Sequence, residues 1–153
     1  MTGPQRITLK RFYPITEEIE LLDLLPADDP RRACNAGAAV SFDLNYDSHV
    51  DIIVGCQWDT VNAHGNSLVN LAFAGDGLGN FRHLDRSEWD REDPLLLHAL
   101  GSTLALGAAD LDNDGLLDLL VNEDEGTAIP ELFMADRIHP GGVYLRCPPT
   151  ENC

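Results

Sequence analysis

Several features common in enzymes and in nucleic-acid-binding proteins are missing from this 153-residue chain. Lys10 is the only lysine, and the 26 acidic residues outnumber the 10 basic ones, which gives a net charge of −16. Such a surface repels nucleic-acid phosphates and anionic membranes, so we expect neither as a partner. No apolar run reaches the roughly 18 residues that a spanning helix needs, so we predict no membrane span.

The motifs of common enzyme classes are also absent. The histidines show no His-Glu-x-x-His spacing, and no serine lies in a Gly-x-Ser-x-Gly context, the nearest being Ser102. The glycine-rich run from Gly75 to Gly79 lacks the Gly-Lys-Ser/Thr ending of a phosphate-binding loop, which favours a hairpin turn. We therefore predict that the protein is not an enzyme.

The 4 cysteines lack the Cys-x-x-Cys spacing typical of metal sites, and their even number permits three disulfide pairings. We favour Cys34 with Cys56 and Cys147 with Cys153, the alternative being free thiols in a reducing compartment. Residues 1–13 contain no apolar segment of a signal peptide, so either a leader was removed or none is used. The favoured location is extracellular or on the cell surface.

The most informative motif is Asp-Leu-Asp-Asn-Asp-Gly-Leu-Leu-Asp at residues 110–118. Side-chain oxygens at positions 1, 3, 5 and 9 of such a loop, with a backbone carbonyl at position 7, suit Ca²⁺, which takes oxygen ligands at roughly 2.3–2.6 Å. Carboxylates this close repel one another unless a cation is present. The predicted ligands are Asp110, Asp112, Asp114, Asp118 and the carbonyl of Leu116.

The same pattern occurs 67 residues earlier, in residues 43–51. Ser48 stands there in place of Gly115, at the sharp turn where a residue with positive φ is needed. We therefore expect two calcium sites, of which the later one binds more tightly. The predicted ligands of the earlier site are Asp43, Asn45, Asp47, Asp51 and the carbonyl of His49.

An EF-hand is the obvious competing interpretation of an Asp-x-Asp-x-Asp-Gly string. That motif requires a bidentate glutamate at loop position 12 and a helix on either side. Position 12 is Val54 in the first loop and Val121 in the second, and short apolar runs follow both loops. We therefore expect each loop to connect two β-strands.

The spacing of the loops divides a single mainly β domain, residues 1–153, into two similar units. The first unit, residues 37–84, contains four short apolar runs separated by the ion loop and by a glycine-rich turn. Four strands at this period are typical of a propeller blade. The predicted strands are Gly37–Phe42, Ile52–Gly55, Ser67–Phe73 and Phe81–Leu84.

The second unit, residues 104–147, shows only three strands and no fourth strand at its C-terminal end. Residues 6–12 alternate well enough to form a strand, and this segment is the candidate for closing the second unit. Residues 17–25 fit either a short helix or another strand. The three strands predicted for the second unit are Leu104–Ala109, Leu119–Asn122 and Gly142–Cys147.

The two Asp loops, together with Ala-Gly-Asp-Gly-Leu-Gly-Asn-Phe at residues 74–81, resemble the FG-GAP/VCBS repeat family. That family forms the β-propellers of integrin α-subunits and occurs in many microbial surface proteins. The resemblance covers roughly residues 37–147, and it implies two propeller-like blades with one Ca²⁺ in each loop. Family propellers usually close with about seven blades, so two alone leave outer faces open.

These patterns predict a calcium-stabilised binding or structural module that engages a protein or glycan partner. The open faces favour a homo-oligomer or a subunit of a larger assembly. One alternative is a carbohydrate-binding lectin, with Trp58, Trp89, Tyr46 and Phe73 as the stacking surface. Another is the accessory module of a hydrolase.

Overall fold

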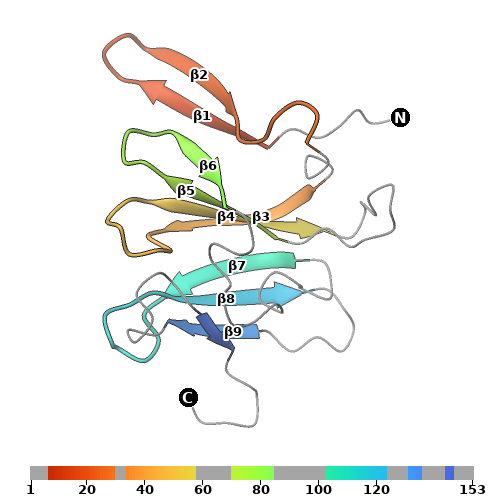
Figure 1. Ribbon diagram of the computed structural model, residues 1–153, viewed down its shortest axis with the longest axis vertical. Coiled ribbons are helices and arrows are strands. Elements are labelled where there is room, and N and C mark those ends of the chain that lie inside the picture. The colour runs from red at the N-terminus through yellow and green to blue at the C-terminus, as the bar shows by residue number, and fades with distance from the viewer. Residues whose placement is uncertain are drawn as a thin grey trace.

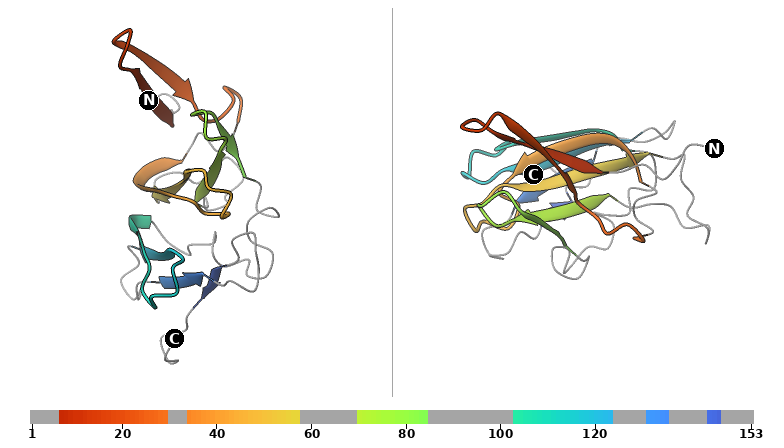
Figure 2. Two further views of the ribbon diagram at one scale, coloured as in Figure 1. Left: turned by 90° about the vertical axis from the view of Figure 1, so that its left-hand side faces the viewer. Right: turned by 90° about the horizontal axis from the view of Figure 1, so that it is seen from above.

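The computed structural model describes residues 7–29, 34–57, 70–84, 103–123, 131–135 and 144–146. These residues form ten β-strands in three antiparallel sheets, which confirms the predicted mainly β fold. None of them belongs to a helix long and apolar enough to cross a membrane. The three sheets are stacked in chain order along the long axis of the molecule (Figure 1, Figure 2).

The middle layer is a four-stranded sheet, here called the central sheet, in which each strand pairs with the next one along the chain. The four strands predicted for the first unit overlap its members. An irregularity in the pairing of the first two strands, between Ala36 and Ala38, accommodates one extra residue. The central sheet consists of β3 (Asn35–Phe42), β4 (Asp51–Gln57), β5 (Leu71–Gly75) and β6 (Phe81–His83).

The last layer, here called the C-terminal sheet, has the same order. It consists of β7 (Thr103–Ala109), β8 (Asp118–Glu123), β9 (Glu131–Ala135) and β10 (Tyr144–Arg146). The prediction of only three strands in the second unit is wrong, because residues 131–135 form the third strand and residues 142–147 contain the fourth. The sequence Glu-Leu-Phe-Met-Ala lacks the polar–apolar alternation that would have indicated a strand.

The first layer is a hairpin of β1 (Thr8–Tyr13) and β2 (Glu18–Asp23). The prediction that residues 6–12 close the second unit is therefore wrong, since β1 pairs with β2 at the opposite end of the molecule. A four-residue connection joins the two strands, and such short loops cost little entropy to close. Residues 17–25, which fitted a helix or a strand, contain β2.

The central sheet is covered on both faces at β4. Ile53 lies in a core shared with the C-terminal sheet, which contributes Leu119 and Val121. The neighbours of Ile53 on either side, Ile52 and Val54, lie in a second core beneath the hairpin. Successive side chains of a strand point to opposite faces, so a strand covered on both sides has a continuous apolar sequence.

The central and C-terminal sheets approach closely where β4 passes β7. A Cβ atom on Gly55 would lie 2.5 Å from Thr103 Cγ2, so only glycine permits this separation. Asn70 Oδ1 accepts hydrogen bonds from Thr103 Oγ1 at 2.9 Å and from the Cys56 amide at 3.0 Å. Because Asn70 and Thr103 are buried, this hydrogen-bonded link fixes one sheet against the other.

The predicted disulfide between Cys34 and Cys56 is confirmed. It joins the residue before β3 to β4, and both cysteines belong to the core beneath the hairpin. The second predicted pair, Cys147 with Cys153, lies outside the described residues.

Replacing Cys34 and Cys56 together by alanine should lower the free energy of unfolding by about 2–4 kcal/mol, because the unfolded chain loses a cross-link. Urea denaturation followed by far-ultraviolet circular dichroism measures this change. An unchanged urea midpoint in the double variant would show that the cross-link does not stabilise the fold.

Candidate metal-binding loops

Each predicted ion loop connects the first two strands of its sheet. Residues 43–50 link β3 to β4, and residues 110–117 link β7 to β8. The expectation that both loops join strands rather than helices is therefore confirmed. Both loops lie at the same edge of the stacked sheets, on the left in Figure 1.

The two loops share one pattern of hydrogen bonds from backbone amides to aspartate or asparagine oxygens. Position 1 accepts from the amides of positions 5 and 6, position 3 from that of position 5, position 5 from that of position 7, and position 9 from that of position 2. The five distances are 2.8–3.0 Å in the first loop and 2.7–3.0 Å in the second. The equivalence inferred from sequence thus extends to the loop conformation.

The strand that directly follows each loop begins with a buried carboxylate. Asp51 and Asp118 are each only 1% exposed. Asp51 accepts hydrogen bonds from the amides of Leu44 and Gly75, both at 2.9 Å, and Asp118 accepts one from Leu111 at 2.7 Å. The two aspartates therefore tie their loops to the sheets, and Asp51 also ties β4 to the end of β5.

Burial raises the pKa of Asp51, and its hydrogen bonds with backbone amides oppose that change only in part. The folded state therefore holds the Asp51 proton more firmly than the unfolded state does. Stability falls as the pH rises from the unfolded pKa to the folded one, because over this range the unfolded state releases its proton while burial makes ionisation costly in the folded state. A cation beside this carboxylate would offset that cost.

Three predicted ligands of the second loop come together in space. Asp110, Asp112 and Asp118 each place one oxygen within 4.8 Å of the others, a group that could hold a metal ion. Asp114 lies next to them in the chain, and its Oδ1 accepts a hydrogen bond from the Leu116 amide at 2.8 Å. Its position stiffens the turn that carries the Leu116 carbonyl.

The first loop offers a weaker set of oxygen ligands for a cation. Asn45 takes the place of Asp112, so an amide oxygen replaces one carboxylate. Asn45 also donates from Nδ2 to Asp47 Oδ2 at 3.0 Å. The His49 amide donates to Asp47 at 2.8 Å and is the main reason that the pKa of Asp47 is lowered. The first loop thus has one carboxylate fewer than the second, which by itself favours weaker binding of a cation.

Two positions of each loop adopt positive φ. Ser48 has φ 70° and Gly115 has φ 87°, as expected for the sharp turn. The other pair is Tyr46, at φ 58°, and Asn113, at φ 63°. Asparagine tolerates this conformation better than tyrosine does, so the first loop holds two unfavourable residues where the second holds none. Sequence reasoning missed Tyr46, although its alignment with Asn113 was visible.

Sequence reasoning also missed Arg11, which links the hairpin to the turn beside the first loop. Its guanidinium donates to the carbonyl of Gly79 and, at 3.3 Å, to Asn80 Oδ1. In the same turn, a Cβ on Gly77 would lie 2.6 Å from the His49 ring, so the turn packs directly on the loop. No local motif marks this link, because Gly79 and Asn80 lie 68 and 69 residues from Arg11 in the sequence.

Of the four aromatic residues considered as the stacking surface of a lectin, Phe73 is not available for that role. Phe73 is completely buried and makes an edge-to-face contact with His83, at 5.5 Å between ring centroids. Tyr46 packs against the core shared by the two large sheets. Trp58 and Trp89 lie outside the described residues.

Comparison of the sequence with protein-family models and with curated proteins found no match.

Exchanging the residues at the sharp turns tests the conformational argument. Gly115→Ser should lower the free energy of unfolding by about 1 kcal/mol, because serine must adopt positive φ. Ser48→Gly should raise it by up to about 1 kcal/mol, the greater freedom of glycine in the unfolded chain removing part of the gain. Thermal unfolding in calcium-free buffer measures both changes.

Gly107→Ser is the matched control for the turn variants. Gly107 lies within β7, and a Cβ there would meet only Leu120, at an ordinary 4.0 Å. Equal losses of stability in Gly115→Ser and Gly107→Ser would contradict a special role for the turn.

Proposed function

We propose that the protein is a calcium-stabilised structural or binding module in which each four-stranded sheet is a propeller-like blade. The observation that carries the proposal is the pair of aspartate loops, which repeat both their sequence and their five amide hydrogen bonds. A turn that served only to reverse the chain would not need acidic or amide side chains at four matched positions, and three of those in the second loop lie close together.

The chemistry of the donors favours Ca²⁺. Both loops offer only oxygens, from carboxylates, one amide and the predicted carbonyls of His49 and Leu116. Hard cations prefer such ligands, whereas zinc and copper sites draw on imidazole nitrogen and thiolate sulfur. Mg²⁺ usually retains several water molecules, so a loop rich in protein oxygens suits the larger ion better.

Bound Ca²⁺ would act on the fold through the loops. It would offset the repulsion among the clustered carboxylates, of which Asp51 and Asp118 are buried. Since these aspartates hold the loop against its sheet, the ion would make the connection between the first two strands rigid. Rigid loops at one edge of the stacked sheets would then present a fixed surface to a protein or glycan partner.

The resemblance to FG-GAP/VCBS repeats supports the same proposal, and with it an extracellular or cell-surface setting. The Cys34–Cys56 disulfide is consistent with an oxidising compartment. We propose a binding role rather than an enzymatic one, because loop oxygens that surround the ion leave no position for a substrate.

Removal of calcium should lower the midpoint of thermal unfolding by about 5–10 °C, because a ligand at about 100 times its dissociation constant contributes ~2.7 kcal/mol to stability. Differential scanning calorimetry with and without a chelator measures the shift, and added Ca²⁺ should reverse it.

Two aspartate variants test whether the loops carry the calcium-dependent shift, and a third variant is their control. Asp51→Asn and Asp118→Asn each keep an oxygen acceptor but remove the charge from one loop, so each should lose part of the calcium-dependent shift. Asp76→Asn makes the same change in the turn between β5 and β6, where Asp76 accepts hydrogen bonds from Leu78 and Asn80. A chelator-insensitive midpoint in the unmodified protein would refute calcium stabilisation.

A further inference from the structure

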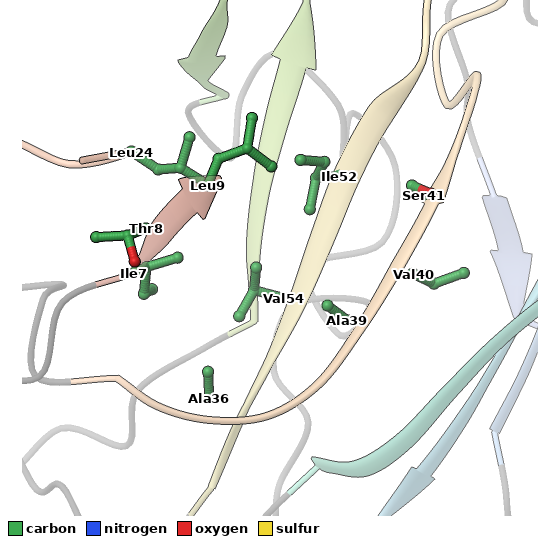
Figure 3. A pocket seen from close by; sticks show the side chains of 10 residues that line it. All are labelled: Ile7, Thr8, Leu9, Leu24, Ala36, Ala39, Val40, Ser41, Ile52 and Val54. Carbon is green, nitrogen blue, oxygen red and sulfur yellow. The ribbon is translucent and has the colours of Figure 1, made fainter. Parts of the chain in front are cut away.

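An apolar groove of about 420 Å³ separates the hairpin from one side of the central sheet. Ile7, Leu9 and Leu24 form one wall, and Ala39, Ile52 and Val54 face them (Figure 3). The hairpin itself lies toward the β5–β6 side of the sheet, where Arg11 contacts Gly79. The groove is therefore the part of this face that the hairpin leaves open.

The contact between the central and C-terminal sheets shows how the positions equivalent to the groove are covered in the second unit. In the C-terminal sheet, Leu106 and Ala108 of β7 pack against the core shared with the central sheet. Sixty-seven residues earlier, the equivalent positions of β3 are Ala39 and Ser41. Both are exposed and line the groove. The same positions are thus covered in one unit and open in the other.

The second strands of the two units do not differ in this way, because both are covered. Leu119 and Val121 of β8 are buried against the central sheet, and their counterparts Ile52 and Val54 of β4 belong to the core beneath the hairpin. The hairpin therefore stands where a preceding four-stranded sheet would stand, but it supplies only two of the four strands. The two missing strands are the ones that would lie over β3.

The edge of β1 borders the groove. Three consecutive residues, Ile7, Thr8 and Leu9, line it. Because successive side chains point to opposite faces of a strand, three in a row line a pocket only when the backbone edge is part of its wall. In the described part of the chain β1 pairs with β2 alone, so its second edge is open to another strand.

We propose that this groove binds two neighbouring β-strands of a partner protein that contains a repeat of the same kind. One of these strands pairs with the free edge of β1. The neighbouring strand runs antiparallel to β1, as neighbours do in all three sheets. Its apolar residues, on alternate positions, cover Ala39 and Ser41. The inference rests on the proposed binding role but does not require calcium at either loop.

The test uses the full chain in Ca²⁺ and a synthetic peptide with the sequence of residues 103–123. This peptide contains the first two strands of the second unit and stands in for the two strands of the partner's repeat. The peptide should bind saturably and slow amide hydrogen exchange in residues 7–13. A peptide of the same composition in scrambled order should not bind. Absence of binding by the ordered peptide, or protection confined to other strands, would overturn the proposal.

Ala39→Arg and Ala36→Arg place a charge on the exposed groove side of β3, and each should weaken peptide binding by about tenfold or more. Both sites are exposed, so the thermal midpoint and the calcium-dependent shift should stay unchanged. Leu21→Arg, a change at a 62%-exposed residue of the hairpin outside the groove, should leave peptide binding intact.

Two further outcomes would overturn the proposal. Peptide binding that survives both arginine variants would place the contact outside the groove. Self-association of the unmodified chain in analytical ultracentrifugation, abolished by Ala39→Arg, would assign the groove to a second copy instead of a partner's strand pair. A failed peptide experiment with a normal response to chelation would leave the calcium proposal standing, so the two failures are distinguishable.

Discussion

The structure depends on a buried carboxylate at the start of the second strand of each large sheet. Asp51 and Asp118 are almost fully removed from solvent, and each accepts a hydrogen bond from the amide at the second loop position. Burying an ionised carboxylate is unfavourable unless donors or a cation compensate it. The surrounding loop supplies some of the donors, and its other carboxylates supply a place for the cation. The same residue thus connects the proposed ion site, the loop and the strand.

From these two anchors the fold extends as a stack of sheets. The central sheet is apolar on both faces, which explains the uninterrupted run Ile-Ile-Val-Gly-Cys in β4. In the described part of the chain, the face of the C-terminal sheet that carries Leu120 has no neighbouring sheet. Ile53 is 1% exposed, whereas its counterpart Leu120 is 43% exposed. The hairpin covers part of the opposite side of the central sheet. Among the described residues, the central sheet therefore has a two-stranded neighbour on one side and a four-stranded neighbour on the other.

Sequence reasoning succeeded where the determinants are local. The spacing of Asp43 to Asp51 and of Asp110 to Asp118 predicted both loops and the strands that flank them. It failed where pairing depends on distant residues. The stretch 131–135 lacks alternation, and nothing local shows that β1 pairs with β2 instead of the last sheet. The partners of Arg11 in the β5–β6 turn are equally invisible. Such choices are decided by competition among edges and faces, which one sequence does not record.

The central claim, that the repeated loops are cation sites of unequal strength, is tested most directly by isothermal titration of Ca²⁺ into the full, chelator-stripped chain. The account predicts two binding events per molecule. The tighter one should belong to the loop of Asp110, which has one more carboxylate and no unfavourable positive-φ residue. A titration with no saturable heat, in a protein that circular dichroism shows to be folded, would contradict the account.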